Sequence, residues 1–351
     1  MPPRVVRLAY WGTMTPSADS VNSLASPTLE ALGEDGVLAR ILTRLPAPDP
    51  ARVPVGPGDD AAVSRIEGRL VTTADMLVEG EDFLPAWCDP VRLGVKAAAQ
   101  NLADVHAMGA APHGLVISLG APGTTPVDVL TGIMDGFAAE ARRAGASVLG
   151  GDLSGGPCLI VSVTALGTLT GPAVLRSGAR PGDAVVLAGT LGRAAAGLDL
   201  LLAGCAPEGA PADLAALIEV QRAPRPDYAA AAAIAGSAHA LIDASDGLAG
   251  DLGRVARASG VAAALDRDAL TALAAPLVPA ARALGDPDPA ARALHWVLTG
   301  GEDHGFIATV DPGRIPVGWT RIGTCRAGDS GVSLDGEPVA DTAFRHFTGD
   351  R

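Results

Sequence analysis

Lysine is almost missing from this chain: Lys96 is the single lysine among 26 basic residues. A Walker A phosphate-binding loop ends in Gly-Lys followed by Ser or Thr, whereas Lys96 lies in the run Gly-Val-Lys-Ala-Ala. The motif set of protein kinases also requires a lysine in its own context, which this chain lacks. The chain therefore contains neither a Walker A loop nor the protein-kinase motifs.

Cysteine, aromatic residues and long apolar runs are scarce as well. The four cysteines form no Cys-x-x-Cys pair, so we expect reduced core thiols and neither a disulfide framework nor a zinc site. Aromatic residues make up 3% of the chain, so Ala, Val and Leu must fill its cores. No apolar run reaches the roughly 18 residues of a membrane span, and Trp11, Gly12 and Pro16 interrupt any signal-like stretch. The sequence predicts a cytoplasmic protein with no membrane partner.

The charge balance limits the partners. Acidic residues outnumber basic ones by 39 to 26, a formal net charge of −13. A general nucleic-acid-binding protein needs a basic face, so this charge argues against nucleic acid. Solubility is the plain interpretation of the acidity. An anionic substrate is compatible with it where bound cations supply local positive charge.

A length of 351 residues predicts two domains. Apolar patterns of strand and helix period alternate along the chain, which favours an α/β (or α+β) fold. We expect a loosely ordered extension over residues 1–33, an N-terminal domain over 34–170 and a C-terminal α/β domain over 171–351. Helices are predicted over residues 33–45, 90–108, 126–144, 192–204, 231–235 and 248–259, and strands over 69–77, 112–119, 159–169, 184–187, 239–242, 306–310, 317–325 and 332–334. Residues 207–226 are predicted to be poorly ordered.

The most distinctive stretch is residues 55–63, which read Val-Gly-Pro-Gly-Asp-Asp-Ala-Ala-Val. Gly and Pro favour a sharp, exposed turn, and Val63 with Ile66 predicts the start of a buried strand. Asp59 and Asp60 repel each other, so one would be driven towards protonation unless a cation or hydrogen-bond donors compensate. We therefore expect this turn to face a divalent cation.

Further acidic residues lie at the edges of apolar runs. Asp75 ends a predicted strand, where α/β proteins often place functional residues, with a solvated Asp as the alternative. Asp104 closes a polar stripe spaced by four along the helix of residues 90–108, and a solvated face is the commoner use of such a stripe. Asp152 stands in a predicted Gly-rich loop that would let backbone approach phosphate, although plain turns use glycine more often. Asp243 and Asp246 follow a short strand, and a simple helix N-cap is an equal alternative for Asp246.

Carboxylates with Ser and Thr neighbours favour hard cations, and the lack of Cys and His in these loops argues against zinc or copper. The six histidines show no metal-ligand spacing, so we take them as structural. Several carboxylates exceed what one Mg²⁺ usually binds, so two or more ions bridged by phosphates fit better. Such a site suits phosphoryl transfer from a nucleoside triphosphate by positioning and charge neutralisation. No Ser/His/Asp or Cys/His arrangement favours a covalent nucleophile.

Seven short motifs occur in an order that resembles one family. They are Gly-Asp-Asp-Ala-Ala-Val from residue 58, Asp-Met-Leu-Val-Glu-Gly from 75, Asn-Leu-Ala-Asp from 101, Gly-Gly-Asp from 150, Arg-Ser-Gly from 176, Asp-Ala-Ser-Asp-Gly from 243 and Gly-Gly-Glu-Asp from 300. Each motif alone is weak, but the ordered set resembles the thiamine-monophosphate kinase family over about residues 34–347.

This resemblance implies the fold of the aminoimidazole-ribonucleotide-synthetase superfamily. The strands of the N-terminal domain would form a barrel at the interface of a homodimer, and the C-terminal domain would be an α/β sandwich. The implied active site lies in clefts between the domains. The implied reaction is the Mg²⁺-dependent transfer of the ATP γ-phosphoryl group to thiamine monophosphate, which gives thiamine diphosphate and ADP.

The resemblance also implies roles for single residues. Positions that bind Mg²⁺ are matched by Asp60, Thr73, Asp75, Asp104, Asp152, Asp243 and Asp246, of which Asp60, Asp75, Asp104 and Asp243 are the candidate catalytic residues. Positions that contact ATP are matched by Gly151, Asp152, Arg176 and Ser245, and positions near the thiamine moiety by Glu302 and Phe344.

Two departures from the family pattern concern the acceptor. Ala74 stands where the family usually has a hydroxyl residue, and Asp82 stands where it usually has a histidine. A carboxylate facing a phosphate-bearing acceptor is repulsive unless a metal or an arginine intervenes, which makes Asp82 a candidate substrate residue. An ATP-dependent enzyme with another acceptor is therefore one alternative, and a non-catalytic ligand-binding dimer is a second. Retention of the predicted metal ligands argues against the second alternative.

Overall fold

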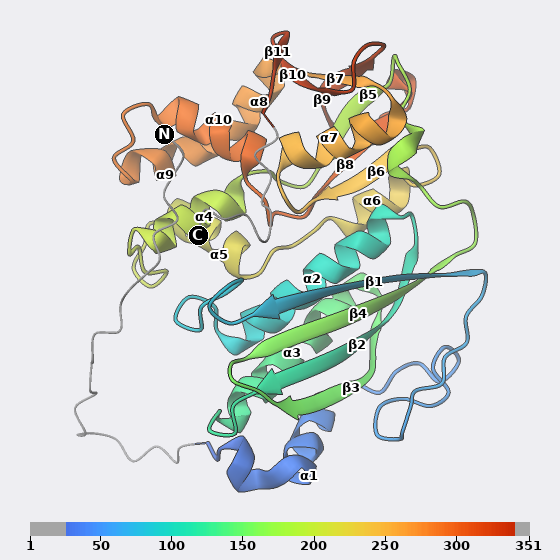
Figure 1. Ribbon diagram of the computed structural model, residues 1–351, viewed down its shortest axis with the longest axis vertical. Helices are drawn as coiled ribbons and strands as arrows, with labels where there is room; N and C mark the ends of the chain where they lie inside the picture. Colours follow the sequence, from blue (N-terminus) through green and yellow to red (C-terminus); the bar gives the residue numbers. More distant parts are fainter. Residues whose placement is uncertain (1–25, 341–351) are drawn as a thin grey trace.

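The computed structural model describes residues 26–340, which form two α/β domains around two separate sheets (Figure 1). The N-terminal sheet has the strand order β1-β4-β2-β3. Its strands are β1 (Arg69–Val78), β2 (Ala111–Ala121), β3 (Ser147–Gly155) and β4 (Ile160–Leu169). β4 runs antiparallel to both of its neighbours, β1 and β2, whereas β2 and β3 are parallel. A helix must therefore cross over between β2 and β3.

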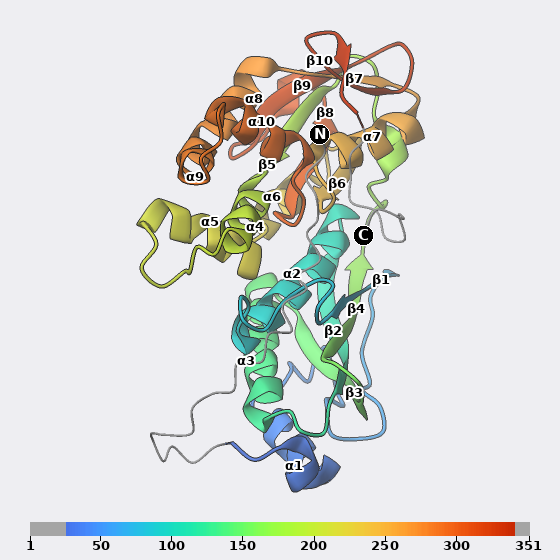
Figure 2. The ribbon, with the colours of Figure 1, turned by 60° about the vertical axis from the view of Figure 1, so that its left-hand side comes forward.

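That crossover helix is α3 (Val127–Ala144), which packs beside α2 (Pro90–Ala107) on one side of the sheet (Figure 2). α2 begins as predicted, because the Asp89 side chain accepts a hydrogen bond from the Arg92 N–H and Pro90 occupies the first helical position. The two helices approach closely at glycines: a Cβ atom on Gly136 would lie 2.1 Å from the Val91 carbonyl oxygen.

The C-terminal sheet has the order β11-β10-β7-β9-β5-β8-β6 and is antiparallel except between β7 and β10. Its strands are β5 (Ala184–Ala188), β6 (Ala240–Ala244), β7 (Ala262–Leu265), β8 (Gly305–Val310), β9 (Thr320–Arg326), β10 (Gly331–Leu334) and β11 (Glu337–Pro338). Its α-helices are α4 (Arg193–Leu202), α5 (Ala212–Arg222), α6 (Tyr228–Ile234), α7 (Leu248–Ser259), α8 (Arg267–Ala274), α9 (Val278–Ala283) and α10 (Pro289–Thr299). Short 3₁₀ turns are η1 (Arg176–Gly178), η2 (Ala275–Leu277) and η3 (Pro312–Arg314).

The two faces of β5 serve different cores, since side chains alternate along a strand. Val186 and its neighbours two residues away face a core that also contains α2 residues such as Leu102. Val185 and Leu187 face a second core built with the helices of the C-terminal domain. The first core is continuous across the junction of the two domains, so apolar packing holds α2 against the C-terminal sheet.

The helix α1 (Leu29–Leu42) begins earlier than predicted. The Thr28 side chain caps it by accepting from the Ala31 N–H, and the chain kinks at Gly33, where φ is 69°. Residues 29–33, which we expected in a loosely ordered extension, are therefore helical, and residues 1–25 lie outside the described part of the chain.

Three further predictions from the sequence are wrong. Residues 207–226 contain the helix α5, because Leu214, Leu217 and Ile218 bury one helical face. Val63 and Ile66 are exposed and start no buried strand. The Gly-rich stretch around Asp152 is not a loop: it lies within the edge strand β3.

Most other predicted elements are confirmed, and α7 has the predicted bounds. Four elements between residues 262 and 299 were not predicted, namely β7, α8, α9 and α10. No helix within residues 26–340 combines the length and apolarity needed to cross a membrane.

The close contact of α2 and α3 predicts a large effect of one methyl group. Gly136→Ala should lower the free energy of unfolding by about 1–3 kcal/mol, because the new Cβ would overlap the Val91 carbonyl oxygen and force the helices apart. Gly236→Ala is the matched control, since a Cβ there would meet nothing within 4 Å. Calorimetric melting of both variants measures the difference, and equal melting temperatures would contradict this account of the contact.

Candidate active site

Acidic residues from the N-terminal domain meet the C-terminal domain at the end of α2. The Thr73 hydroxyl on β1 donates to Asp104 Oδ2 on α2 over 2.8 Å. Two residues along β1, the Asp75 N–H donates to Asn101 Oδ1 over 3.1 Å. Asn101 is fully buried and also donates to the Ala97 carbonyl oxygen one helical turn earlier. These bonds fix the register of β1 against α2 and place both predicted acids on one side of the junction.

The C-terminal domain contributes Asp243, which is buried inside β6. Its Oδ2 atom lies 3.1 Å from Nδ1 of His304, which is also buried. Burial opposes the charged form of His304, but the hydrogen bond and negative charge of Asp243 outweigh it and raise the pKa of the imidazole. His304, which we take as structural from its sequence, thus lies beside the candidate catalytic residue Asp243. The signal in the sequence was its position directly after the Gly-Gly-Glu-Asp motif.

Asp246 is held by an ion pair rather than by helix capping. Arg254 Nη2 lies 2.5 Å from Asp246 Oδ2, and Arg254 also pairs with Asp251. Gly247 is the N-cap of α7, and no side chain within residues 26–340 caps that helix, so the N-cap alternative for Asp246 is wrong. Asp251 is fully buried and accepts from the Asp246 N–H over 2.9 Å. Asp251 and Arg254 were not predicted as site residues, although they lie on one face of the predicted helix.

Two acids of the N-terminal domain, Asp75 and Asp104, have raised pKa values. Burial, the charge of Asp243 and the charge of Asp75 raise the pKa of Asp104 to about 7, against the hydrogen bond from Thr73. Partial burial raises the pKa of Asp75 and His304 lowers it, while Asp243 and Asp246 add to the increase. Acids that stand far apart in the sequence are thus close enough to repel one another. The cluster is short of positive charge.

The residues present fit a hard divalent cation. Within residues 26–340, no three Asp, Glu, His or Cys side chains gather closely enough to hold a metal by themselves. Mg²⁺ does not require such a cage, because it usually keeps several waters and binds one or two carboxylates together with substrate phosphates. The candidate ligands here are carboxylate and hydroxyl oxygens. The raised pKa values of Asp75 and Asp104 mark an excess of negative charge that a cation would relieve.

The structure does not bring every predicted residue to this cluster. Asp60 is exposed, and its N–H donates to the neighbouring Asp59 side chain. Asp152 is exposed on β3 and pairs with Ser118 of β2. Gly151 has a packing reason to be glycine, since a Cβ there would lie 1.7 Å from a β2 carbonyl oxygen.

Two predicted ATP-contacting residues also have backbone roles. Arg176 is exposed in η1, and its carbonyl oxygen accepts from the Ser259 hydroxyl. The Ser245 carbonyl oxygen accepts from the Glu302 N–H over 2.9 Å, which joins the two C-terminal loops of the site. Phe344 lies outside the described residues.

Glu302 is held by the single lysine of the chain. Lys96 Nζ lies 2.7 Å from Glu302 Oε1, and Gln221 Nε2 donates to Glu302 Oε2 over 2.7 Å. Lys96 is only 2% exposed, so the polar stripe of α2 is not a solvated face at this position. Asp303 accepts hydrogen bonds from the Thr190 hydroxyl and from two N–H groups at the start of α4, which the helix otherwise leaves unsatisfied.

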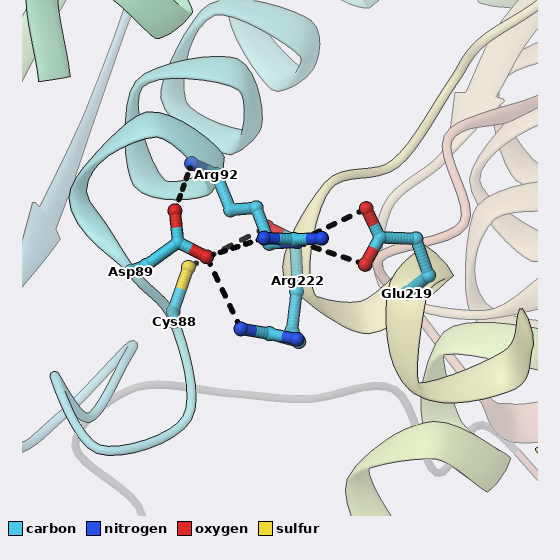
Figure 3. Close-up of polar contacts among 5 residues, drawn as sticks. All are labelled: Cys88, Asp89, Arg92, Glu219 and Arg222. Atoms are coloured by element: carbon cyan, nitrogen blue, oxygen red, sulfur yellow. Dashed lines mark hydrogen bonds and ion pairs between the residues drawn. The ribbon is translucent and has the colours of Figure 1, made fainter. Parts of the chain in front are cut away.

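A second set of charges joins the start of α2 to the end of α5 (Figure 3). Asp89 pairs with Arg92 of its own helix and with Arg222 of α5, at 2.5 and 3.1 Å. Arg92 Nε also donates to both oxygens of Glu219. The Cys88 thiol donates to the Arg222 carbonyl oxygen over 3.5 Å. These contacts fix the end of α5, which carries Gln221 to Glu302.

Asp82 has a structural contact of its own. Its Oδ2 atom accepts from the Val78 N–H over 2.8 Å and closes the turn that follows β1. This contact accounts for a hydrogen-bond acceptor at position 82 independently of any substrate.

Two family models cover most of the described chain. The AIR synthase related protein N-terminal domain matches residues 58–169, and the corresponding C-terminal domain matches residues 180–310. Among curated relatives, the thiamine-monophosphate kinase of Mycobacterium tuberculosis is 46% identical over 323 residues, which is 89% of this chain and 90% of that protein. The Escherichia coli K12 enzyme of the same name is 35% identical and covers 88% of this chain and 96% of its own length.

Solved structures agree with this grouping. The thiamine-monophosphate kinase of Stenotrophomonas maltophilia superposes with a TM-score of 0.72 at 34% identity, over 87% of this chain and 96% of that chain. AaThiL, solved in complex with AMPPCP and TMP, superposes with a TM-score of 0.71 at 30% identity, over 93% of this chain and 100% of that chain. With matches of this extent in both domains, the chain belongs to the thiamine-monophosphate kinase family of the AIR synthase related proteins.

Proposed function

We propose that this chain is an ATP-dependent kinase that transfers the γ-phosphoryl group of ATP to the phosphate of thiamine monophosphate, giving thiamine diphosphate and ADP. Family membership supports this reaction, and the related AaThiL was solved with an ATP analogue and TMP, which we take as thiamine monophosphate. The observation that carries it in this chain is the cluster of mutually repelling carboxylates contributed by both domains. Such a cluster suits bound cations and phosphates and is a costly arrangement without them.

Mg²⁺ ions bound here would neutralise charge on the phosphate oxygens. Asp75, Asp104, Asp243 and Asp246, with the Thr73 hydroxyl, are the proposed metal-binding residues in the cluster. His304 holds the Asp243 carboxylate in one orientation by its hydrogen bond. Asp60, Gly151, Asp152, Arg176 and Ser245 remain the proposed contacts to nucleotide and metal from the neighbouring segments. Phe344 and Glu302 remain the proposed residues beside the acceptor.

A homodimer is part of this proposal. The face of the N-terminal sheet opposite α2 and α3 carries exposed apolar side chains, of which Leu70 and Met76 on β1 are each 54% exposed. Ala74 of β1 is on the same face as Leu70 and Met76, because side chains alternate along a strand. Thr164 of β4 is paired with both Ala74 and Val116, so Val116 of β2 also lies on that face. Pairing with the same face of a second copy would bury these side chains and complete the barrel implied by the family. Sedimentation analysis of the full chain measures its oligomeric state.

The four cysteines are free thiols, which suits the proposed cytoplasmic location.

The second candidate function is an ATP-dependent reaction with another acceptor, and two features of the sequence favour it. Asp82 and Ala74 depart from the family pattern beside the acceptor. An ATPase screen across phosphorylated and carboxylate compounds would reveal such a substrate. Binding of ATP without turnover of any acceptor would favour the non-catalytic dimer.

Purified chain supplied with ATP, Mg²⁺ and thiamine monophosphate should form thiamine diphosphate and ADP in equal amounts. Chromatographic detection of the diphosphate measures this directly. If no diphosphate forms while ATP still binds, the proposed acceptor is wrong.

Asp104→Asn should abolish measurable turnover and leave the fold intact. The variant keeps an oxygen that can accept from the Thr73 hydroxyl but loses the charge proposed to bind Mg²⁺. Asp329→Asn, at an exposed loop position, is the matched control and should retain activity. Circular dichroism checks the fold of both variants, and an active Asp104→Asn would remove Asp104 from the metal site.

The raised pKa of Asp104 also predicts a dependence of stability on pH in a chelating buffer. Between the ordinary value of 3.8 and about 7, the folded state keeps a proton that the unfolded state has lost. Stability therefore falls as the pH rises through this window. Asp104→Asn lacks this contribution, so its melting temperature should fall less than that of the native chain from pH 5 to pH 8. An equal fall in melting temperature for the two proteins would contradict a raised pKa at Asp104.

Asp82→Asn tests whether the charge at position 82 opposes the acceptor. The amide oxygen can still accept from the Val78 N–H, so the turn after β1 is kept, whereas histidine would alter it. The KM for thiamine monophosphate should fall and the KM for ATP should stay the same. An unchanged or higher KM for the acceptor would leave Asp82 with its structural role alone.

A further inference from the structure

Three acids of the cluster have one carboxylate oxygen bound and the other left open. The bound oxygen is Oδ2 in each case, and a neighbouring side chain holds it. These pairs are Asp104 with Thr73, Asp243 with His304, and Asp246 with Arg254. The other oxygen, Oδ1, has no hydrogen-bond partner within residues 26–340, and in none of the three acids is it fully buried. Each of these acids therefore presents a single oxygen to a ligand.

Buried acids with structural contacts show a different pattern, in which both oxygens are bound. Asp251 accepts from Arg254 at Oδ1 and from the Asp246 N–H at Oδ2. Asp303 accepts from the Thr190 hydroxyl at Oδ1 and from an N–H group of α4 at Oδ2. Because a buried carboxylate is stable only when its oxygens have partners, an oxygen left open in the cluster points to a ligand from outside the chain.

The support of Asp246 is a closed ring of three residues at the start of α7. Arg254 Nη2 lies 2.5 Å from Asp246 Oδ2, and Arg254 Nη1 donates to Oδ1 of Asp251. Asp251 is fully buried, and its Oδ2 accepts from the Asp246 N–H over 2.9 Å. The ring fixes the backbone and the side chain of Asp246 together. Its Oδ2 therefore cannot leave the guanidinium to reach a cation, whereas Oδ1 is available.

The number of oxygens that a carboxylate offers affects which cation fits the site. Mg²⁺ requires a nearly ideal octahedron of oxygens, whereas Ca²⁺ takes about six to eight oxygens in flexible geometry and readily accepts both oxygens of one carboxylate. A carboxylate oxygen in a charge-assisted hydrogen bond with arginine is strongly held, so only the second oxygen can bind a metal. Side chains that hold ligating carboxylates in this way tune the metal site.

We propose that Arg254, fixed by Asp251, restricts Asp246 to binding a cation through Oδ1 alone and thereby makes the acid cluster select Mg²⁺ over Ca²⁺. This inference rests on the proposed function, which assigns Asp246 as a metal-binding residue. Arg254 and Asp251 are positioning residues, because they act through Asp246 and not on the cation. The other two acids keep their own supports when Arg254 is changed, so the effect of one released oxygen can be measured separately.

Thermal melting of the full chain in increasing concentrations of MgCl₂ or CaCl₂, without nucleotide, tests the proposal. A cation that binds the folded state raises the melting temperature according to its affinity, so the two series give the ratio of the affinities for the two ions. Both ions carry the same charge, so the loss of one positive charge nearby changes both affinities alike. The ratio therefore reports the geometry of the carboxylate and not the charge of the site.

The variants are Arg254→Met, which frees Asp246 Oδ2, and Asp251→Asn, which keeps the size of the side chain but turns an amide towards one of its two donors. Arg292→Met is the matched control, because Arg292 Nη2 also lies 2.5 Å from Oδ2 of an aspartate, Asp199. Asp246→Asn measures the stabilisation that comes from the other acidic groups of the chain.

The native chain should bind Mg²⁺ at least as tightly as Ca²⁺. Arg254→Met and Asp251→Asn should shift the affinity ratio several-fold towards Ca²⁺, while Arg292→Met should keep the native ratio. Circular dichroism checks the fold of each variant. The Arg254 side chain is 34% exposed, so its replacement should be tolerated, and Arg254→Met decides the test if Asp251→Asn does not fold.

An unchanged ratio in Arg254→Met, a native preference for Ca²⁺, or a native stabilisation no larger than that of Asp246→Asn would overturn the proposal. A higher KM for ATP in Arg254→Met with an unchanged ratio would assign the arginine to the nucleotide and would also overturn it. A shifted ratio without formation of thiamine diphosphate by the native chain would overturn the proposed reaction and not this inference.

Discussion

The packing of α2 between the two domains is the constraint on which the rest of this structure depends. Leu102 and its neighbours bury one side of the helix in a core that extends to Val186 of the C-terminal sheet. Asp89 at its start is paired with Arg222 of α5, and Asp104 near its end is bonded to Thr73 of β1. Because the helix is fixed at both ends and along its length, its polar side chains have defined positions opposite the C-terminal loops. The site is a consequence of that placement.

Apolar packing brings together groups that would otherwise separate. Burial, together with the charge of Asp243 across the junction, raises the pKa values of Asp75 and Asp104. His304 offsets part of this repulsion through its contact with Asp243, and Arg254 does so through its ion pairs with Asp246 and Asp251. The domains thus hold an arrangement that is electrostatically unfavourable by itself and that the cations and phosphates of the proposed function would relieve. Ligand binding and closure of the junction should therefore stabilise each other.

Local signals in the sequence predicted much of the fold. Asp89 followed by Pro90 specifies the start of α2, and the strand pattern before Asp75 specifies β1, since caps and alternation are local properties. The acids of the cluster were likewise visible as carboxylates beside apolar runs. Lys96 and His304 were missed because their roles arise from residues distant in sequence, Glu302 and Asp243, whose positions only the folded chain defines. The segments of Asp60 and Asp152 also looked like site loops, but they have no contact with the cluster in the described part of this single chain.

The contacts of the Gly-Gly-Glu-Asp-His segment, residues 300–304, could not be predicted from its amino-acid composition. Three consecutive side chains contact three different elements: Glu302 binds Lys96 of α2, Asp303 caps α4, and His304 binds Asp243 of β6. A regular strand would send neighbouring side chains to two opposite faces, so the backbone must turn at nearly every residue. It does so through positive φ angles at residues 302 and 304. The preceding glycines fit because a Cβ on Gly301 would lie 2.2 Å from the Ser245 carbonyl oxygen. Packing explains these glycines without any phosphate, and the strain they permit lets one short segment connect the acid cluster to the buried lysine.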